Sequence, residues 1–221
     1  MRYDLENPAA GVAYKLLVGL AAPRPIALIT SMSEKGELNA APFSAYNYLC
    51  TDPPIIGVGV NNRPTREPKD TAYNIRLTGE FVVNIVTEDI AQQMNICAAE
   101  CPAEINELEL AGFTTAPSAL VKVPRIEQAH AALECREYVT IEVGRSRIIL
   151  GRVVSVYIED RYVDPSGPYV RAQELGLIGR MNGRGNYVTT KDAFVTIPRV
   201  TYEELIKAKG CTEEDITAET T

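Results

Sequence analysis

The most informative pattern of apolar and polar residues lies between residues 23 and 47. Residues 26–31 run from apolar side chains into two hydroxyl residues, Thr30 and Ser31, which is typical of a buried strand that ends at a polar site. The turn-rich residues 33–37 follow, and they predict that the chain reverses into a second strand. The pattern therefore predicts a β-hairpin near the start of the chain.

The return strand of this hairpin has an unusual composition for a core strand. It places Asn39, Pro42 and Ser44 among small residues, and a proline cannot donate to the hydrogen-bond ladder of a sheet. Two interpretations are open. The small side chains would let a ligand lie close to the backbone, with N–H groups and hydroxyls as its donors, or the segment is an edge strand that ends at a proline.

Similar patterns predict the remaining elements. A buried strand is expected over 55–60, where Gly57 and Gly59 would mark either a close approach of another backbone or a flat ligand, or a β-bulge. A helix is expected with Asp70 as its N-cap and Gly79 just past its end. We also expect a short strand or helical turn at 14–18, strands at 80–86, 133–143, 148–158 and 187–190, a helix after Thr87 that buries Ile90, Met94 and Cys97, and a helix-like segment at 202–209.

Composition narrows the classes of partner. The chain has 221 residues, of which 46% are hydrophobic, and a formal charge of −7. The apolar content is ample for a packed core, and the negative charge argues against a nucleic-acid or anionic-membrane surface, because both need clustered positive charge. The start of the chain lacks a basic and apolar leader, and no stretch is long enough to span a bilayer. We therefore expect a cytoplasmic protein whose partners are small molecules or other protein chains.

Cysteine and histidine content gives little support for a metal site. Cys97 and Cys101 are four residues apart on a predicted helix and could in principle hold a metal, but the sole histidine, His130, is distant in sequence. Five cysteines fit reduced core thiols better than a disulfide framework. We expect no metal.

Several familiar catalytic motifs are missing. The sequence has no Gly-x-Ser-x-Gly motif and no Gly-x-x-x-x-Gly-Lys phosphate loop, and the glycines of residues 57–59 do not continue into a dinucleotide fingerprint. These absences disfavour hydrolase, P-loop and Rossmann interpretations.

One anion site remains, at Lys69-Asp70-Thr71. A helix start offers unpaired N–H groups, the Thr71 hydroxyl can donate, and Lys69 with Arg63 can neutralise a phosphate. Asp70 would repel a phosphate, so we assign it to the N-cap or to a sugar hydroxyl. Taken alone, these residues are equally typical of ordinary helix capping beside a surface lysine.

A late segment, residues 179–187, combines three glycines with two arginines. Such a segment could fold over an anionic ligand. It could equally form a flexible turn before the final strand.

In combination, these blocks resemble the flavin reductase-like family of FMN-binding split barrels. The order and spacing of the blocks carry the resemblance, which covers roughly residues 20 to 190. The matching blocks are Arg24-Pro25-Ile26-Ala27-Leu28-Ile29-Thr30-Ser31, Asn39-Ala40-Ala41-Pro42-Phe43-Ser44, Asp52-Pro53-Pro54, Lys69-Asp70-Thr71, Phe81-Val82-Val83-Asn84 and Leu133-Glu134-Cys135.

The resemblance implies a mainly β fold with peripheral helices, namely a Greek-key split β-barrel in a homodimer with FMN near the subunit interface. The chemistry would take place on the flavin, so no catalytic side chain is expected, and NAD(P)H would be a transient reductant. The residues implied to border the isoalloxazine are Thr30, Ser31, Asn39, Ala41, Pro42, Phe43 and Ser44, with Asn47 close by, and those implied to take the phosphate are Arg63, Lys69 and Thr71, with Asp70 nearby.

Three functions are consistent with this sequence. The first is an NAD(P)H-dependent flavin reductase-like oxidoreductase, the second is an FMN-binding electron carrier that does not turn over NAD(P)H, and the third is a flavin-free dimeric binding module. No internal repeat or linker-like break is visible, so we expect one domain over 1–221, with a core at about 20–190 and a C-terminal helix and tail after 200.

Overall fold

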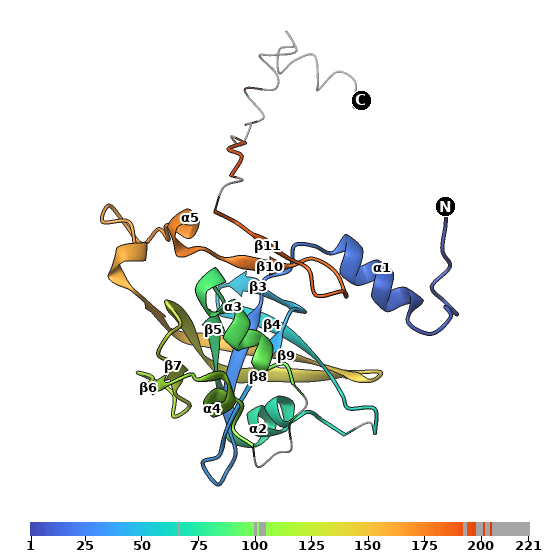
Figure 1. The fold of residues 1–221 in the computed structure, drawn as a ribbon, viewed down its shortest axis with the longest axis horizontal. Coiled ribbons are helices and arrows are strands. Elements are labelled where there is room, and N and C mark those ends of the chain that lie inside the picture. Colours follow the sequence, from blue (N-terminus) through green and yellow to red (C-terminus); the bar gives the residue numbers. More distant parts are fainter. Residues whose placement is uncertain are drawn as a thin grey trace, which may run out of the picture.

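The computed structural model describes residues 1–65, 67–99, 101, 105–191, 194–197, 201 and 204. Most of its regular structure is β (Figure 1). The helical elements are Val12–Leu20 (α1), Asp70–Thr78 (α2), Glu88–Ile90 (η1), Ala91–Ile96 (α3), Glu107–Ala111 (α4), Asp160–Tyr162 (η2) and Ala172–Leu175 (α5). The strands are Ala27–Met32 (β1), Leu38–Phe43 (β2), Tyr46–Thr51 (β3), Pro54–Asn61 (β4), Glu80–Ile85 (β5), Thr115–Ala116 (β6), Arg125–Ile126 (β7), Ala131–Val143 (β8), Ser146–Ile158 (β9), Ile178–Arg180 (β10) and Tyr187–Thr189 (β11).

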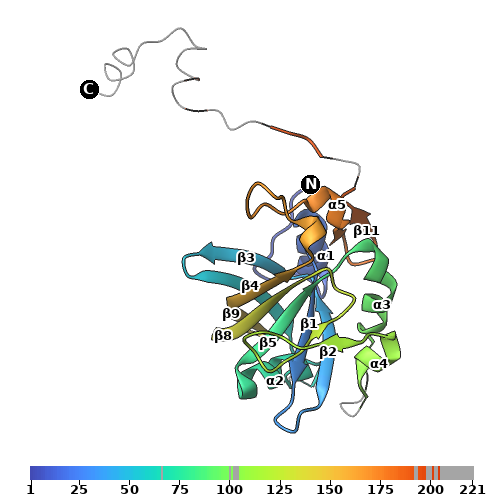
Figure 2. The same ribbon diagram turned by 90° about the vertical axis from the view of Figure 1, so that its left-hand side faces the viewer.

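A seven-stranded antiparallel sheet organises the chain, in the order β2-β1-β5-β8-β9-β4-β3. β2 and β3 lie at opposite edges of this sheet, yet only Ser44 and Ala45 separate them in sequence. Such a short connection requires the sheet to curl until its edges come together, and the Gly59 amide accordingly donates to the Ala45 carbonyl oxygen at 2.7 Å. Figure 2 shows the result, with β3 and β4 on one side of the curled sheet and β1 and β2 on the other.

β1 is buried on both of its faces. Leu28 packs into a cluster with residues of α3 and α4, whereas Ile29 packs with Ile56 and Phe81 inside the curled sheet. Burial on both faces explains why the sequence of this strand is a continuous apolar run rather than an alternating one.

The two predicted hairpins are confirmed. β1 pairs with β2 and β8 pairs with β9, both antiparallel. The predicted strand at 55–60 is also confirmed, and its glycines mark the close approach of two side chains. A Cβ atom at Gly57 would lie 2.6 Å from Leu49 Cδ1 of β3, and one at Gly59 would lie 3.0 Å from Cβ of Ala45, in the β2–β3 connection. The predicted helical element after Thr87 buries its expected side chains, which are Ile90, Met94 and Cys97.

The start of α2 corrects one prediction. Lys69, not Asp70, occupies the N-cap position, and it makes no side-chain cap. Asp70 is instead the first helical residue, and its carboxylate pairs with Arg63. Gly79 ends the helix with φ of 70° as expected, which is a conformation that favours glycine. Most of the helix-like segment expected at 202–209 lies outside the described residues.

α1 lies on the outside of the molecule. None of its residues is buried, and in Figure 1 it extends away from the sheet, beside the β10–β11 hairpin. The turn of that hairpin comes close to it, since a Cβ atom at Gly183 would lie 3.2 Å from Tyr14 Cε1. Among the described residues, no helix is long and apolar enough to cross a membrane.

Candidate functional site

A groove runs past the connection between β2 and β3. It consists of a larger cavity of about 560 Å³ and a smaller one of about 140 Å³, and the two share Pro42, Phe43, Lys69 and Ala98 as lining residues. The smaller cavity lies at the start of α2, whereas α1, α3 and the β10–β11 hairpin contribute to the larger one. We refer to these as the α2 end and the β10–β11 end of the groove.

A hydrogen-bonded network of side chains supports the α2 end. Asn39 Nδ2 donates to Thr71 Oγ1 at 2.9 Å and to Ser31 Oγ at 3.4 Å, and Asn74 Nδ2 donates to Ser31 Oγ at 3.3 Å. The amides of β2 and α2 therefore fix the hydroxyls of β1 and α2 in place. Because Thr71 Oγ1 already accepts a hydrogen bond from Asn39, its own proton can be directed to another acceptor.

The charges at this end are partly balanced within the protein. Arg63 Nη2 lies 2.6 Å from Asp70 Oδ2, and Arg63 Nη1 donates to the Pro68 carbonyl oxygen at 3.0 Å. Lys69 lines both cavities. The ion pair reduces the repulsion that Asp70 would exert on an anion, so the start of α2 can serve as an anion site.

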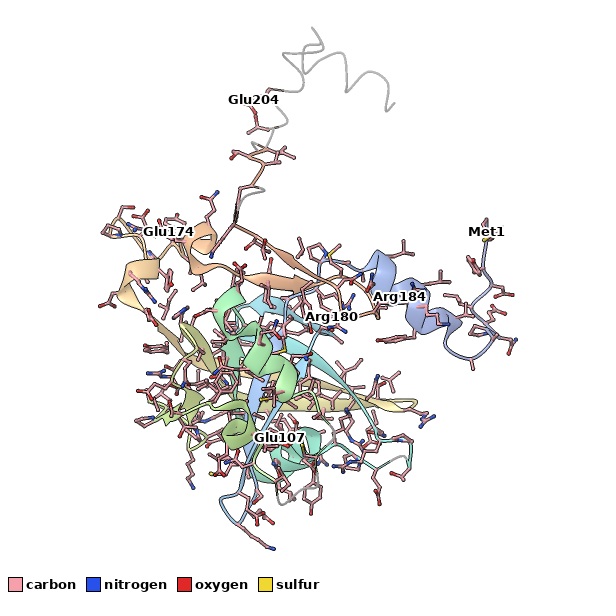
Figure 3. All side chains as sticks on the ribbon, in the orientation of Figure 1. Met1, Glu107, Glu174, Arg180, Arg184 and Glu204 are labelled. Carbon is pink, nitrogen blue, oxygen red and sulfur yellow. The ribbon has the colours of Figure 1, made fainter. Side chains whose placement is uncertain are left out.

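A buried carboxyl group, Glu107, also lines the α2 end, and Figure 3 labels it. Its Oε2 accepts a hydrogen bond from the Ala40 amide at 3.2 Å. Burial raises the pKa of the Glu107 carboxyl, and the nearby charge of Asp70 adds to the shift. Burial also raises the pKa of the adjacent Cys97 thiol to about 12, which disfavours the reactive thiolate at neutral pH.

Two arginines lie at the β10–β11 end, and they are used differently. Arg24 Nη1 donates to three backbone carbonyls, those of Val18, Ala21 and Met181, at 2.5, 3.0 and 3.2 Å. Arg180 stacks over the Tyr187 ring, with Cζ 4.6 Å from the ring centroid. Arg24 therefore holds α1 and the hairpin in place, whereas Arg180 forms part of the cavity wall.

Most of the residues expected to bind FMN are brought together along this groove. The predicted residues that line it are Asn39, Ala41, Pro42, Phe43, Ser44, Arg63, Lys69, Asp70 and Thr71.

Thr30, Ser31 and Asn47 do not line the groove. Neighbouring residues of a strand face opposite sides, and Thr30 faces away: it is fully buried and donates to the Pro124 carbonyl oxygen at 2.8 Å. Ser31 is buried beneath the groove, and its Oγ accepts a hydrogen bond from Asn39, which lines the groove. Asn47 lies exposed on the opposite edge strand, β3. Thr30 and Ser31, which were expected to border the isoalloxazine, and Asn47, which was expected close by, are therefore not among the residues that line the groove.

Several lining residues were not predicted as site residues. The larger cavity is also lined by Tyr14, Arg24, Arg180 and Tyr187, and the smaller one by Glu107 of α4. The combination of glycines and arginines at 179–187 was the one local signal that pointed to this part of the site.

The fold and the groove define a class of protein, an antiparallel barrel that is open at one seam with a cavity beside that seam. Residues 20–173 match the family model of the flavin reductase like domain. The chain therefore belongs to the flavin reductase-like family, and this confirms the predicted family.

Three solved structures are similar over most of their length. Nitrilotriacetate monooxygenase component B from Bacillus cereus is 32% identical, with a TM-score of 0.83 over 89% of this chain and 98% of that chain. The 2-nitrobenzoate 2-nitroreductase NbaA from Pseudomonas fluorescens is 36% identical, with a TM-score of 0.80 over 90% of this chain and 96% of that chain. A protein with a split barrel domain from Shewanella frigidimarina is 20% identical, with a TM-score of 0.77 over 90% and 100% of the two chains, and it supports the fold alone. The predicted split-barrel fold is confirmed.

Proposed function

We propose that this protein is an FMN-binding oxidoreductase that accepts hydride from NAD(P)H, as a flavin reductase-like enzyme. The observation that carries the proposal is a single groove in which a cationic helix start adjoins a wall of small and apolar residues. Membership of the family and the redox enzymes among its structural neighbours support it further.

The α2 end of the groove fits the phosphate of FMN. α2 is nine residues long, and its first N–H groups with the helix dipole favour an anion. Lys69 and Arg63 supply positive charge, and the Thr71 hydroxyl, oriented by Asn39, supplies a donor. We assign these residues to the phosphate.

The wall beside it fits a flat ring. β2 is an edge strand, and the Ala40 amide points away from β1, because it bonds to Glu107. With a repeat of two residues, the next outward position is Pro42, which has no N–H to leave unpaired. Ala41, Pro42, Phe43 and Ser44 would thus border the isoalloxazine with small or apolar surface. Ser31 would support this wall from beneath, since its Oγ accepts a hydrogen bond from Asn39.

Bound FMN would supply the hydride-transfer chemistry, so the protein has to hold it, orient it and limit water rather than provide an acid-base pair. The groove meets these requirements with its cationic end, its apolar wall and the cover that α1 and the β10–β11 hairpin provide.

We further propose a homodimer. Large apolar side chains are exposed on α1, on β3 and on the β8–β9 hairpin, with Leu20 at 82%, Tyr48 at 71% and Tyr138 at 60% of full exposure. Side chains of this kind on several elements indicate a covered surface. Size-exclusion chromatography with light scattering would test it, and a monomer at micromolar concentration would contradict it.

The test of the function is a titration of the purified protein with FMN and with riboflavin, followed by NADH or NADPH under anaerobic conditions. We expect a bound-flavin absorption band at about 450 nm that bleaches on addition of one of the nucleotides. A protein that takes up no flavin would contradict the whole proposal. A protein that takes up FMN but is bleached by neither nucleotide would contradict the NAD(P)H step and favour an electron carrier.

A further inference from the structure

The described lining of the β10–β11 end of the groove is rich in cations. It includes Arg24, Lys69 and Arg180 and, among the described residues, no Asp or Glu. The chain as a whole carries a formal charge of −7, so a cavity lined in this way differs from the rest of the molecule. A cavity of one sign with apolar walls concentrates ligands of the opposite sign.

Of these cations, Arg180 has the guanidinium that is best placed to bind a ligand. Arg24 donates from Nη1 to three backbone carbonyls and from Nε to Ser44 Oγ, and Lys69 is shared with the α2 end. Arg180 donates one hydrogen bond, from Nε to the Asn182 carbonyl oxygen at 3.2 Å, and within the described part of the chain its two Nη groups donate none. A guanidinium with both Nη groups available matches the two oxygens of a carboxylate.

The walls around Arg180 are aromatic and apolar. Tyr187 lies under the guanidinium, and Tyr14, Leu17 and Met94 contribute other parts of the lining. Tyr14 packs close to the hairpin turn at Gly183, so α1 and the hairpin enclose the cavity together. Such walls favour a planar ring over a flexible polar chain.

We propose that the β10–β11 end is the substrate site and that it takes a planar aromatic carboxylate, whose carboxylate group pairs with Arg180 while its ring lies against Tyr187 and Tyr14. The inference rests on the proposed function, because a substrate of the bound flavin has to lie next to it. Arg180 is then a specificity-determining residue that selects anionic over neutral aromatic compounds.

The test compares benzoate with benzamide, two ligands of similar shape that differ in charge. Calorimetric titrations of the apoprotein and the FMN-loaded protein are expected to give benzoate at least about tenfold tighter binding than benzamide. Arg180→Gln should weaken benzoate binding about tenfold or more and leave benzamide and FMN binding within about twofold. Arg180→Lys keeps the charge but loses the forked geometry, so its benzoate affinity should lie between those of the wild type and Arg180→Gln.

Arg184→Gln is the matched control, since Arg184 lies in the same hairpin and is exposed (Figure 3). It should leave all three affinities unchanged. The thermal unfolding midpoint of each variant identifies any variant that fails to fold. If Arg180→Gln fails to fold, the benzoate affinity of Arg180→Lys decides the result.

Equal binding of benzoate and benzamide, or an equal loss in Arg184→Gln and Arg180→Gln, would overturn the inference. So would a loss of NADPH affinity in Arg180→Gln without any benzoate binding, because the anion at Arg180 would then belong to the dinucleotide. Failure of the wild type to take up FMN contradicts the proposed function instead, and the apoprotein titration still decides whether Arg180 selects a carboxylate.

Discussion

The two ends of the groove differ in how their polar groups are satisfied. At the α2 end, Arg63 is paired with Asp70, Asn39 bonds to Thr71, and the Glu107 carboxyl accepts a backbone amide. At the β10–β11 end, cations lie among aromatic and aliphatic side chains, and no carboxylate appears among the described lining residues. The first end is fixed by hydrogen bonds and an ion pair among its side chains, whereas the arginines of the second bond mainly to backbone carbonyls.

This difference is consistent with different kinds of ligand at the two ends. A resident cofactor is best held by a site whose donors are oriented in advance, since less ordering is then needed on binding. A substrate that enters and leaves is better served by an open cavity with few fixed contacts. The contrast therefore agrees with the proposed function, in which the α2 end holds the phosphate of the cofactor and the β10–β11 end takes the exchanging ligand.

The strongest test of the contrast is removal of the cations at the α2 end. Lys69→Ala combined with Arg63→Ala should weaken FMN binding by about 100-fold or more, because two charge-assisted contacts to the phosphate are lost. Riboflavin, which lacks the phosphate, should lose less than about threefold. Fluorescence titration of each flavin measures both values, and an equal loss for the two ligands would disprove the phosphate assignment.

Two further variants control this result. Arg76→Ala removes an exposed cation from the last turn of α2 and should leave both affinities unchanged. Arg63→Ala with Asp70→Asn removes both members of the ion pair. If this double variant binds FMN as well as the wild type does, Arg63 only neutralises Asp70, and its direct contact with the phosphate is ruled out.

The parts of the fold that sequence could predict are those encoded locally. The β1–β2 and β8–β9 hairpins follow from apolar runs joined by turn residues, and the end of α2 follows from Gly79. The predicted N-cap position was wrong by one residue, because the Asp70 carboxylate forms an ion pair with Arg63 rather than a cap. Cap and ion pair use the same carboxylate, and the sequence does not show which partner it takes.

The parts that could not be predicted depend on contacts between distant segments. β1 is buried on both faces, so no alternation of polar and apolar residues shows that Ser31 lies beneath the groove while Thr30 faces away from it. Glu107 and Arg180 reach the groove from α4 and β10. Only the curled sheet and the helices packed on it bring these residues together.

The side-chain network at the α2 end gives a test of intermediate size. Asn39→Ala leaves Thr71 Oγ1 without its donor and Ser31 Oγ with one donor fewer, so unfolding should be easier by about 1 to 2 kcal/mol. FMN affinity should fall about fivefold, because the Thr71 hydroxyl is no longer oriented. Urea denaturation and flavin titration measure the two effects.

A double-mutant cycle that combines Asn39→Ala with Thr71→Val measures the coupling free energy of the two side chains and distinguishes it from nonspecific destabilisation. The two changes together should cost about 1 kcal/mol less than the sum of the single changes. Thr65→Val, the same substitution at an exposed threonine of the adjoining loop, should have little effect. Strict additivity of Asn39→Ala and Thr71→Val would show that the two side chains do not act as a unit.

The smallest expected effect concerns Glu107, a carboxyl group of the α2 end whose pKa is raised by burial. Because the folded protein holds this proton to higher pH than the unfolded chain does, the favourable contribution is complete below the ordinary pKa of glutamate and is lost as the pH rises through the raised value. Glu107→Gln cannot ionise and can still accept the bond from the Ala40 amide.

We therefore expect Glu107→Gln to raise the unfolding midpoint by about 2 °C near neutral pH, with the difference disappearing in acid, because the wild-type carboxyl is then protonated. Glu109→Gln, an exposed neighbour on α4, should show no such pH-dependent difference. If Glu107→Gln lowers the midpoint at neutral pH, the charged carboxylate stabilises the β2–α4 contact. The α2 end would then carry the negative charge of Glu107, which would oppose the binding of a phosphate there.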